Sequence, residues 1–129
     1  LALFFHFPLL YAGFSAEREA ELLCLFCIAT VFWDFLWFSL NPHFGLRRFW
    51  RGEIWWFPTW LGPLPSAYWG GLVAGFFLWI APALLRDGPA LGRRAAGYGL
   101  LVLEFAILAA VTISSWLLCR RLGRKPPAG

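Results

Sequence analysis

Two acidic residues interrupt long apolar runs, and their chemistry is the hardest to explain by packing alone. Asp34 lies within residues 22–40 and Glu104 within residues 95–119. A carboxylate in the middle of a bilayer costs roughly 3 kcal/mol or more, so each acid needs a partner or a proton. Such an acid can belong to a proton relay or an ion path. It can also be a neutral or hydrogen-bonded structural group that faces another helix, which is the interpretation we favour.

The positions of the two acids in their runs argue against one shared site. Asp34 follows the middle of its run and Glu104 precedes the middle of its own. If both runs cross the membrane in the same direction, the acids differ in depth by about 9 Å. We therefore expect separate partners. For Asp34 these are Thr30, one turn earlier, or Arg47 or Arg48 reaching back from the membrane surface, or a group from another subunit.

His6 lies in the first apolar stretch, residues 1–14. A neutral imidazole there could ligate the magnesium of a chlorophyll-type pigment or a haem iron. A haem with two histidine ligands would need His43, which we expect at a different depth. A pigment site with His6 as its single ligand stays open, and a hydrogen bond to a neighbouring helix is the alternative that we favour.

Two pairs of small side chains repeat at helical spacing. Cys24 and Cys27 share one helix face, but an apolar run lacks the exposed, electropositive setting of a redox thiolate, and the further ligands of a zinc site are missing. We interpret these cysteines as packing residues. Gly71 and Gly75 form a G-x-x-x-G pattern, which lets two membrane helices approach closely and predicts a helix contact.

The composition excludes most soluble classes of protein. The 129 residues are 60% hydrophobic and only 14% charged, whereas a soluble domain carries about 25% charged residues. An ordinary cytosolic enzyme, a disordered tail and a disulfide-rich secreted domain are all excluded. The net charge is +4, and the basic residues lie beside the apolar runs. This placement indicates that they orient the protein in the membrane and contact anionic lipids, rather than bind nucleic acid.

Apolar runs and helix breakers predict an all-α bundle of about four membrane spans in a single domain, 1–129. The predicted spans are residues 1–14, 22–40, 67–85 and 95–119, followed by a basic tail at 120–129. We interpret the short first run as part of a longer helix rather than a signal remnant. With four spans, seven Lys and Arg residues lie on one side and four on the other. This predicts a multi-pass protein of a bacterial inner or intracytoplasmic membrane, with both termini cytoplasmic.

Residues 41–66 are too charged to span a membrane and too rich in aromatic side chains to lie free in water. Tryptophan prefers the headgroup level, so we predict a loop or short helix in the interface. Aromatic side chains also anchor contacts between proteins. The residues expected to contact a partner protein or a flat cofactor are Trp33, Trp37, Trp50, Trp55, Trp56, Trp60, Gly71 and Gly75.

The segment FWDFLWFSLNPHFG at residues 32–45, with the aromatic residues that follow it, resembles a pattern in small uncharacterised multi-spanning bacterial membrane proteins. The resemblance covers roughly a quarter of the chain, residues 30–60, and it names no activity. It implies that Asp34, Asn41, Pro42 and Gly45 belong to one structural unit at a membrane face.

The sequence contains no nucleophile–base pair, metal constellation or phosphate-binding loop. We therefore expect a non-catalytic accessory subunit of a larger bacterial membrane complex, in a bioenergetic or photosynthetic (reaction-centre or antenna) setting. Larger membrane subunits and anionic lipids are the expected partners, and lipid, quinone, carotenoid or a chlorophyll-type pigment are candidate ligands. One alternative is a small proton or ion carrier that uses Asp34 and Glu104. Another is a membrane enzyme acting on lipid or quinone, with His43 and Glu53 at the interface.

Overall fold

Three long apolar helices dominate the computed structural model, which describes residues 6–50, 53–85 and 91–123. They are α3 (Ala16–Leu40), α5 (Ser66–Leu85) and α6 (Leu91–Leu122). Each is long and apolar enough to cross a membrane, because about 20 helical residues match a hydrocarbon core about 30 Å thick. The predicted all-α class is confirmed, and the spans predicted at 22–40, 67–85 and 95–119 fall within these helices.

The predicted count of four spans is not confirmed, because the described part of the chain contains three. The described part of the first apolar stretch, residues 6–14, contains α2 (Phe7–Ala12), six residues long, which rises about 9 Å. Gly13 ends α2 with a φ of 76°, a conformation that favours glycine. Ser15 then caps α3 by accepting a hydrogen bond from the Arg18 amide at 3.2 Å.

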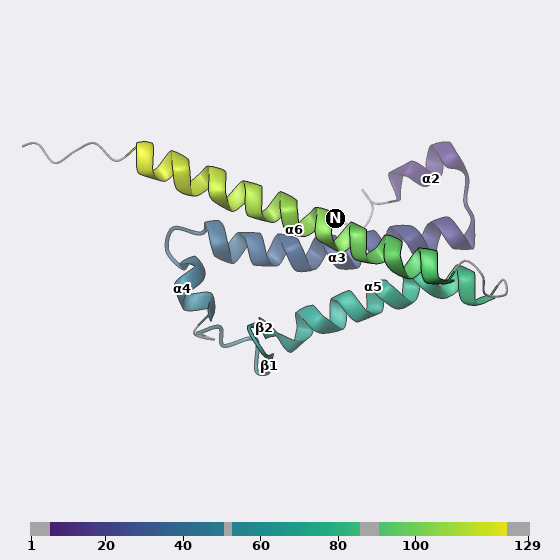
Figure 1. Ribbon diagram of the computed structural model, residues 1–129, viewed down its shortest axis with the longest axis horizontal. Helices are drawn as coiled ribbons and strands as arrows, with labels where there is room; N and C mark the ends of the chain where they lie inside the picture. Colours follow the sequence, from purple (N-terminus) through teal and green to yellow (C-terminus); the bar gives the residue numbers. More distant parts are fainter. Residues whose placement is uncertain (1–5, 51–52, 86–90, 124–129) are drawn as a thin grey trace, which may run out of the picture.

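The three helices form an up-down-up arrangement (Figure 1). Helices α3 and α6 run in the same direction and α5 runs against both. The start of α3 and the end of α6 therefore lie at opposite ends of the bundle. Four spans would put both termini on one side, and that predicted orientation stays a prediction.

The glycine motif of α5 packs against α3, so the predicted helix contact is confirmed. A Cβ atom at Gly71 would lie 2.8 Å from Cγ2 of Val31, and one at Gly75 would lie 3.5 Å from the Cys24 carbonyl oxygen. Cys24 itself is fully buried, in agreement with a packing role. Small side chains allow the two backbones to approach this closely.

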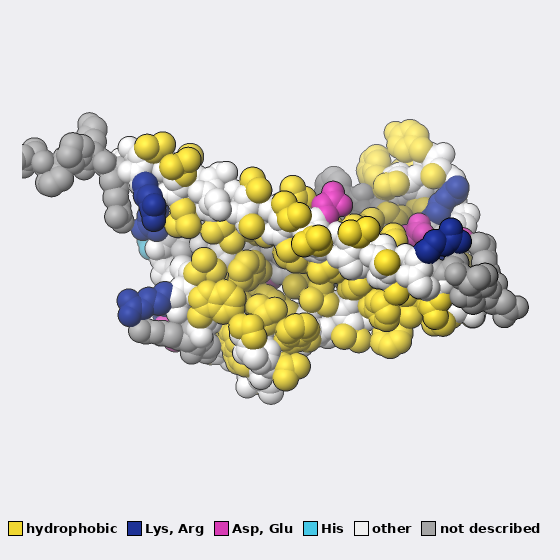
Figure 2. Space-filling model, viewed as in Figure 1, with side chains coloured by type: hydrophobic (Ala, Val, Ile, Leu, Met, Phe, Trp, Pro, Cys, Tyr) yellow, Lys and Arg dark blue, Asp and Glu magenta, His cyan; other side chains and the backbone are white. Residues whose placement is uncertain are grey.

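Helix α6 is the least packed of the three. Ala109 is its one buried residue. Its contact with α3 includes Phe105, whose ring centroid lies 5.7 Å from that of Phe32. Hydrophobic side chains cover much of its outer surface in Figure 2. In a membrane this surface faces lipid or another protein.

The described residues 41–50 and 53–66 fold into a compact unit that we call the aromatic cap. It contains α4 (Gly45–Trp50) and a hairpin of β1 (Trp60–Leu61) and β2 (Leu64–Pro65), which pair antiparallel. Asn41 and Gly45 form the turn between α3 and α4, where the Gly45 amide donates to the Asn41 carbonyl oxygen at 3.1 Å. The cap lies at the end of the bundle where α3 ends and α5 begins (Figure 1).

The aromatic cap shares a core with α3 and α5. Phe49 and Ile54 of the cap are buried together with Phe38 of α3 and Tyr68 of α5, and the partly buried side chains around them are Val31, Phe35, Phe44, Phe57, Trp60 and Leu64. The short helix α4 agrees with the predicted loop or short helix, and the location of this segment in the membrane interface stays a prediction. Trp60 packs edge-on against Phe49 with centroids 5.5 Å apart, and the partner contact predicted for Trp60 stays a prediction.

The opposite end of the bundle is held by a polar cluster around Arg94, which we call the arginine clamp. The Arg94 guanidinium donates to the carboxylates of Glu17 and Glu21 in α3 and to the Trp79 carbonyl oxygen in α5. The Trp79 indole N–H donates back to the Arg94 carbonyl oxygen at 2.8 Å. One side chain of α6 therefore connects all three helices.

Candidate functional site

A hydrogen bond between α3 and α5 resolves how Asp34 is held. The Tyr68 hydroxyl donates to Oδ2 of Asp34 at 2.6 Å. Tyr68 lies in the first turn of α5 and is buried. Its ring packs edge-on against Phe57, with centroids 5.6 Å apart, and near Phe49 at 6.1 Å. The aromatic cap therefore positions the hydroxyl that binds the acid.

Two of the partners predicted for Asp34, Thr30 and Arg48, are bonded elsewhere, and a partner from another subunit stays a prediction. The Thr30 hydroxyl donates to the Phe26 carbonyl oxygen at 2.8 Å, within its own helix. Arg48 binds Oε2 of Glu53 at 3.0 Å. Neither side chain is bonded to Asp34 in the described part of the chain.

A sequence signal for the Tyr68 pairing was present. Asp34 lies one and a half turns before the end of α3, and Tyr68 lies near the start of α5. Because α3 and α5 are antiparallel neighbours, the end of one helix and the start of the next lie at a similar level. Tyr68 is also the one side chain with an ionisable group in residues 66–85. The sequence does not give the rotation of α5 about its own axis, and this rotation is what directs Tyr68 toward α3.

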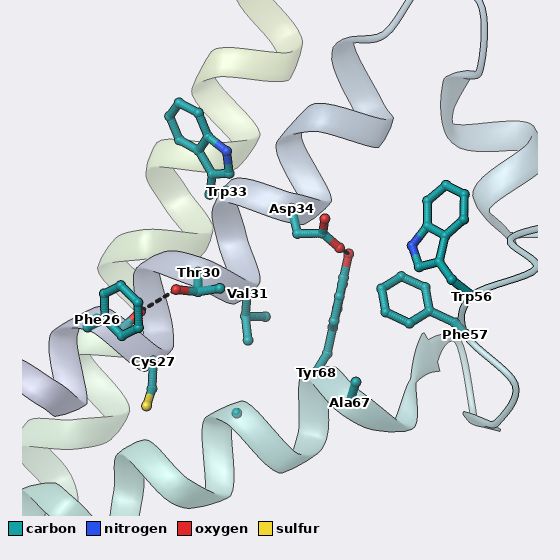
Figure 3. Close-up of a pocket in the computed structure, with 11 residues that line it drawn as sticks. Phe26, Cys27, Thr30, Val31, Trp33, Asp34, Trp56, Phe57, Ala67 and Tyr68 are labelled. Atoms are coloured by element: carbon teal, nitrogen blue, oxygen red, sulfur yellow. Dashed lines mark hydrogen bonds between the residues drawn. The ribbon is translucent and has the colours of Figure 1, made fainter. Parts of the chain in front are cut away.

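The Asp34–Tyr68 pair lies in an open groove of about 520 Å³ between α3 and α5. Figure 3 shows Asp34 and Tyr68 pointing toward each other, with Trp56 and Phe57 of the cap beside the hydroxyl. The groove continues along α3 past apolar and small side chains. The residues that line it are Phe26, Cys27, Thr30, Val31, Trp33, Asp34, Trp56, Phe57, Ala67, Tyr68 and Gly71.

Glu104 lies elsewhere and in a different environment. It is exposed on α6, and among the described residues it has neither a hydrogen-bond nor an ion-pair partner. The contact between Phe32 and Phe105 places the two acids closer in level than the predicted 9 Å. They still form no common site, since Asp34 is bonded toward α5 and Glu104 lies on the outer surface of α6.

The hydrogen bond to a neighbouring helix that we favoured for His6 is present, and a pigment site with His6 as its single ligand stays a prediction. His6 precedes the six-residue helix α2. Its Nε2 lies 2.7 Å from Oε1 of Glu19 in the first turn of α3. The ring is therefore part of the polar end of the bundle, where it joins α2 to α3.

His43 and Glu53, the residues of the enzyme alternative, meet at Arg48 in the aromatic cap. Arg48 binds the Glu53 carboxylate and lies 3.4 Å from the His43 carbonyl oxygen. The His43 amide donates to Oδ1 of Asn41 at 2.9 Å. Both side chains are exposed, and neither lines the Asp34–Tyr68 groove. His43 is part of the α3–α4 turn, and Glu53 follows α4 and is bonded back to Arg48.

Most of the predicted interface tryptophans are exposed. Trp33 and Trp37 lie one turn apart on α3 and are 68% and 52% exposed. Together with Thr112 of α6 they line a second groove, of about 560 Å³, between α3 and α6. Trp50, Trp55 and Trp56 are exposed on the aromatic cap. We call the side of the bundle formed by Trp33, Trp37, Thr112, Leu108 and Glu104 the α3–α6 surface.

The described residues hold no cluster of three or more His, Cys, Asp or Glu side chains that could bind a metal ion.

Comparison of the chain with known proteins identifies no family for it. None of the protein-family models, curated proteins or solved structures compared with the chain matches it. The resemblance to small uncharacterised membrane proteins stays a prediction.

Proposed function

We propose that this chain is a non-catalytic accessory subunit that docks in a membrane against a larger subunit through the α3–α6 surface. The observation that carries the proposal is Glu104, an acid within a candidate span that is exposed and lacks a partner in the described part of the chain. A lipid-facing carboxylate is costly. A hydrogen-bond donor on a neighbouring protein helix removes that cost.

The side chains around Glu104 support a protein neighbour. Leu108 and Thr112 follow it at intervals of four residues, so the three lie on successive turns of one side of α6. Thr112 lines the α3–α6 groove with Trp33 and Trp37. Exposed tryptophans beside a groove are typical of contact surfaces between proteins. The partner chemistry that fits is an apolar helix with one donor side chain at the level of Glu104.

The proposal also concerns the membrane in which the complex lies and the kind of complex it is. A bacterial inner membrane fits the composition, and we retain it within the proposal. The bioenergetic or photosynthetic setting was suggested by the tryptophan content and by a histidine expected inside a span, whereas His6 precedes α2 and is bonded to Glu19 in the first turn of α3. We therefore propose a larger membrane complex, and the proposal includes no bound pigment.

The proton-carrier alternative receives no support from the geometry. A relay needs ionisable groups that follow one another through the membrane. Asp34 and Glu104 lie on different sides of the bundle, and no described ionisable side chain connects them. This alternative, like the enzyme alternative, stays a prediction.

Photo-crosslinking in native membranes tests the docking proposal. A photoreactive amino acid replaces Leu108 on the α3–α6 surface or, as a control, Phe77 on α5. The two positions are equally exposed, at 56% and 58%. We expect a discrete protein adduct from position 108 and lipid adducts from position 77. The protein adduct should decrease strongly when Glu104→Leu is added. Lipid adducts alone at both positions would overturn the proposal.

A further inference from the structure

The Asp34 carboxylate has no counter-charge. It accepts one hydrogen bond, from the neutral Tyr68 hydroxyl, and no second partner for it exists among the described residues. No Lys, Arg or His side chain lines the groove in that part of the chain. A carboxylate in an apolar setting is stabilised by an opposite charge. Here the groove offers the space for one.

Aromatic side chains line the groove that contains this carboxylate. Trp33 of α3 and Trp56, Phe57 and Tyr68 of the cap region all line the groove. Figure 3 shows Trp56 and Phe57 on one side of the contact between Asp34 and Tyr68. The part of α3 that carries Cys27, Thr30 and Val31 lies on the other side. Aromatic faces attract cations through the ring quadrupole, most strongly when the cation is poorly hydrated. A carboxylate among aromatic rings therefore selects positive charge.

The remainder of the groove is suited to an apolar group. It continues past Phe26, Val31, Ala67 and Gly71, none of which has a polar side chain. Its volume of about 520 Å³ lies in the range of about 300–1,000 Å³ that small-molecule sites occupy. The groove is open at the surface of two spanning helices, so a ligand can enter from the lipid.

We propose that the Asp34–Tyr68 groove binds a lipophilic monocation, such as an onium ion that carries aryl or alkyl groups. The charge would lie between Asp34 and the aromatic rings, and the apolar groups would extend along α3 toward Phe26. An anionic ligand is disfavoured by the Asp34 charge. A ligand with a carbonyl head is disfavoured as well, because it would bring an acceptor against the carboxylate while the Tyr68 proton is already donated. Trp33 borders both this groove and the α3–α6 surface, whereas Glu104, the residue on which the docking proposal depends, does not line the groove.

Direct binding of tetraphenylphosphonium to the purified full chain in detergent micelles tests the proposal. We expect saturable binding, measured by equilibrium dialysis and by quenching of tryptophan fluorescence. Asp34→Asn removes the charge and keeps an acceptor for Tyr68, and it should weaken binding by about tenfold or more. Trp56→Leu should weaken it by about threefold to tenfold. Glu104→Gln removes an intramembrane acid outside the groove and should leave binding unchanged.

A neutral compound separates charge recognition from general partitioning. Triphenylphosphine oxide has a similar aryl shape with an acceptor in place of the charge, and we expect it not to compete for the site. Thermal unfolding of each variant shows whether it remains folded, which matters for Trp56→Leu because this half-exposed ring stacks on Phe38. Equal binding of the neutral compound, or binding unaffected by both Asp34→Asn and Trp56→Leu, would refute a cation site. So would no saturable binding of tetraphenylphosphonium.

Discussion

The helices are held together at both ends of the bundle, but by different kinds of interaction. At one end the arginine clamp ties α3, α5 and α6 through one guanidinium, two carboxylates and an indole. At the other end the aromatic cap joins α3 to α5 by ring packing around Phe49. The clamp acts through a few strong, directed contacts, and the cap acts through many weak ones.

The two ends also differ in which groups are accessible. At the clamp end Arg94 is paired with Glu17 and Glu21, and the Glu19 oxygen Oε2, which has no hydrogen-bond partner among the described residues, is buried. On the cap side the second oxygen of Asp34 has no partner in the described part of the chain, and the rings of Trp33 and Trp56 are exposed. Both proposed contact sites lie away from the clamp.

The largest expected effect comes from the centre of the cap. Phe49 is fully buried and contacts rings from α3, β1 and α5. Phe49→Ala should lower the free energy of unfolding by about 3–5 kcal/mol, because it removes these contacts and leaves a cavity. Unfolding in mixed SDS micelles measures this change. Trp55→Ala, at a ring that is 87% exposed, is the control and should change it by less than about 0.5 kcal/mol.

The clamp should show the next largest effect. Arg94→Leu leaves two glutamates without their cation. Because the Arg94 side chain is 22% exposed, we expect a loss of about 2–3 kcal/mol, below that of a fully buried pair. Arg93→Leu at the exposed neighbouring position should have little effect. Adding Glu17→Gln and Glu21→Gln to Arg94→Leu should restore part of the loss, and an equal loss in Arg93→Leu would contradict the clamp.

The helix contact between the two ends should show a smaller effect. Gly71→Ala places a methyl group 2.8 Å from Cγ2 of Val31, so α3 and α5 must separate slightly. We expect a loss of about 1–2 kcal/mol in the same unfolding assay. Gly70→Ala is the matched control, since nothing lies within 4 Å of its Cβ position. If both variants were equally stable, the close approach at Gly71 would not matter to the fold.

The smallest effect should come from the bond that joins the cap to Asp34. Tyr68→Phe keeps the ring in the cap and removes the hydroxyl. Hydrogen bonds between membrane helices contribute about 0.6 kcal/mol on average and about 1.7 at most, so we expect a loss of about 1 kcal/mol. A double-mutant cycle with Asp34→Asn measures the coupling between the two side chains. A coupling of zero would show that the bond contributes nothing to stability.

Several elements could be predicted from the sequence because their signals are local. The apolar runs at 22–40, 67–85 and 95–119 predict helices through their length and composition alone. Asn41 and Pro42 predict the end of α3 through backbone geometry. The Gly71 and Gly75 spacing predicts a close contact, although not that α3 is the partner.

Other elements could not be predicted because their contacts depend on helix rotation and chain reversal. Residues 41–66 have the composition of an interfacial loop, yet α4 and the hairpin fold that segment onto Phe38 and Tyr68. Arg94 counts as one more positive charge in the sequence, and only its position beside α3 makes it a link among three helices.

Residue types alone indicate that this chain is suited to a membrane and that two acids, Asp34 and Glu104, must be accommodated there. Hydropathy is summed residue by residue, so a membrane-spanning chain can be recognised without knowledge of its contacts. The folded arrangement was needed to find that Asp34 is bonded to Tyr68 beside a groove, while Glu104 is exposed and has no partner among the described residues. A hydrogen bond requires two particular side chains, 34 residues apart here, to meet within about 3 Å, and residue types do not specify that meeting.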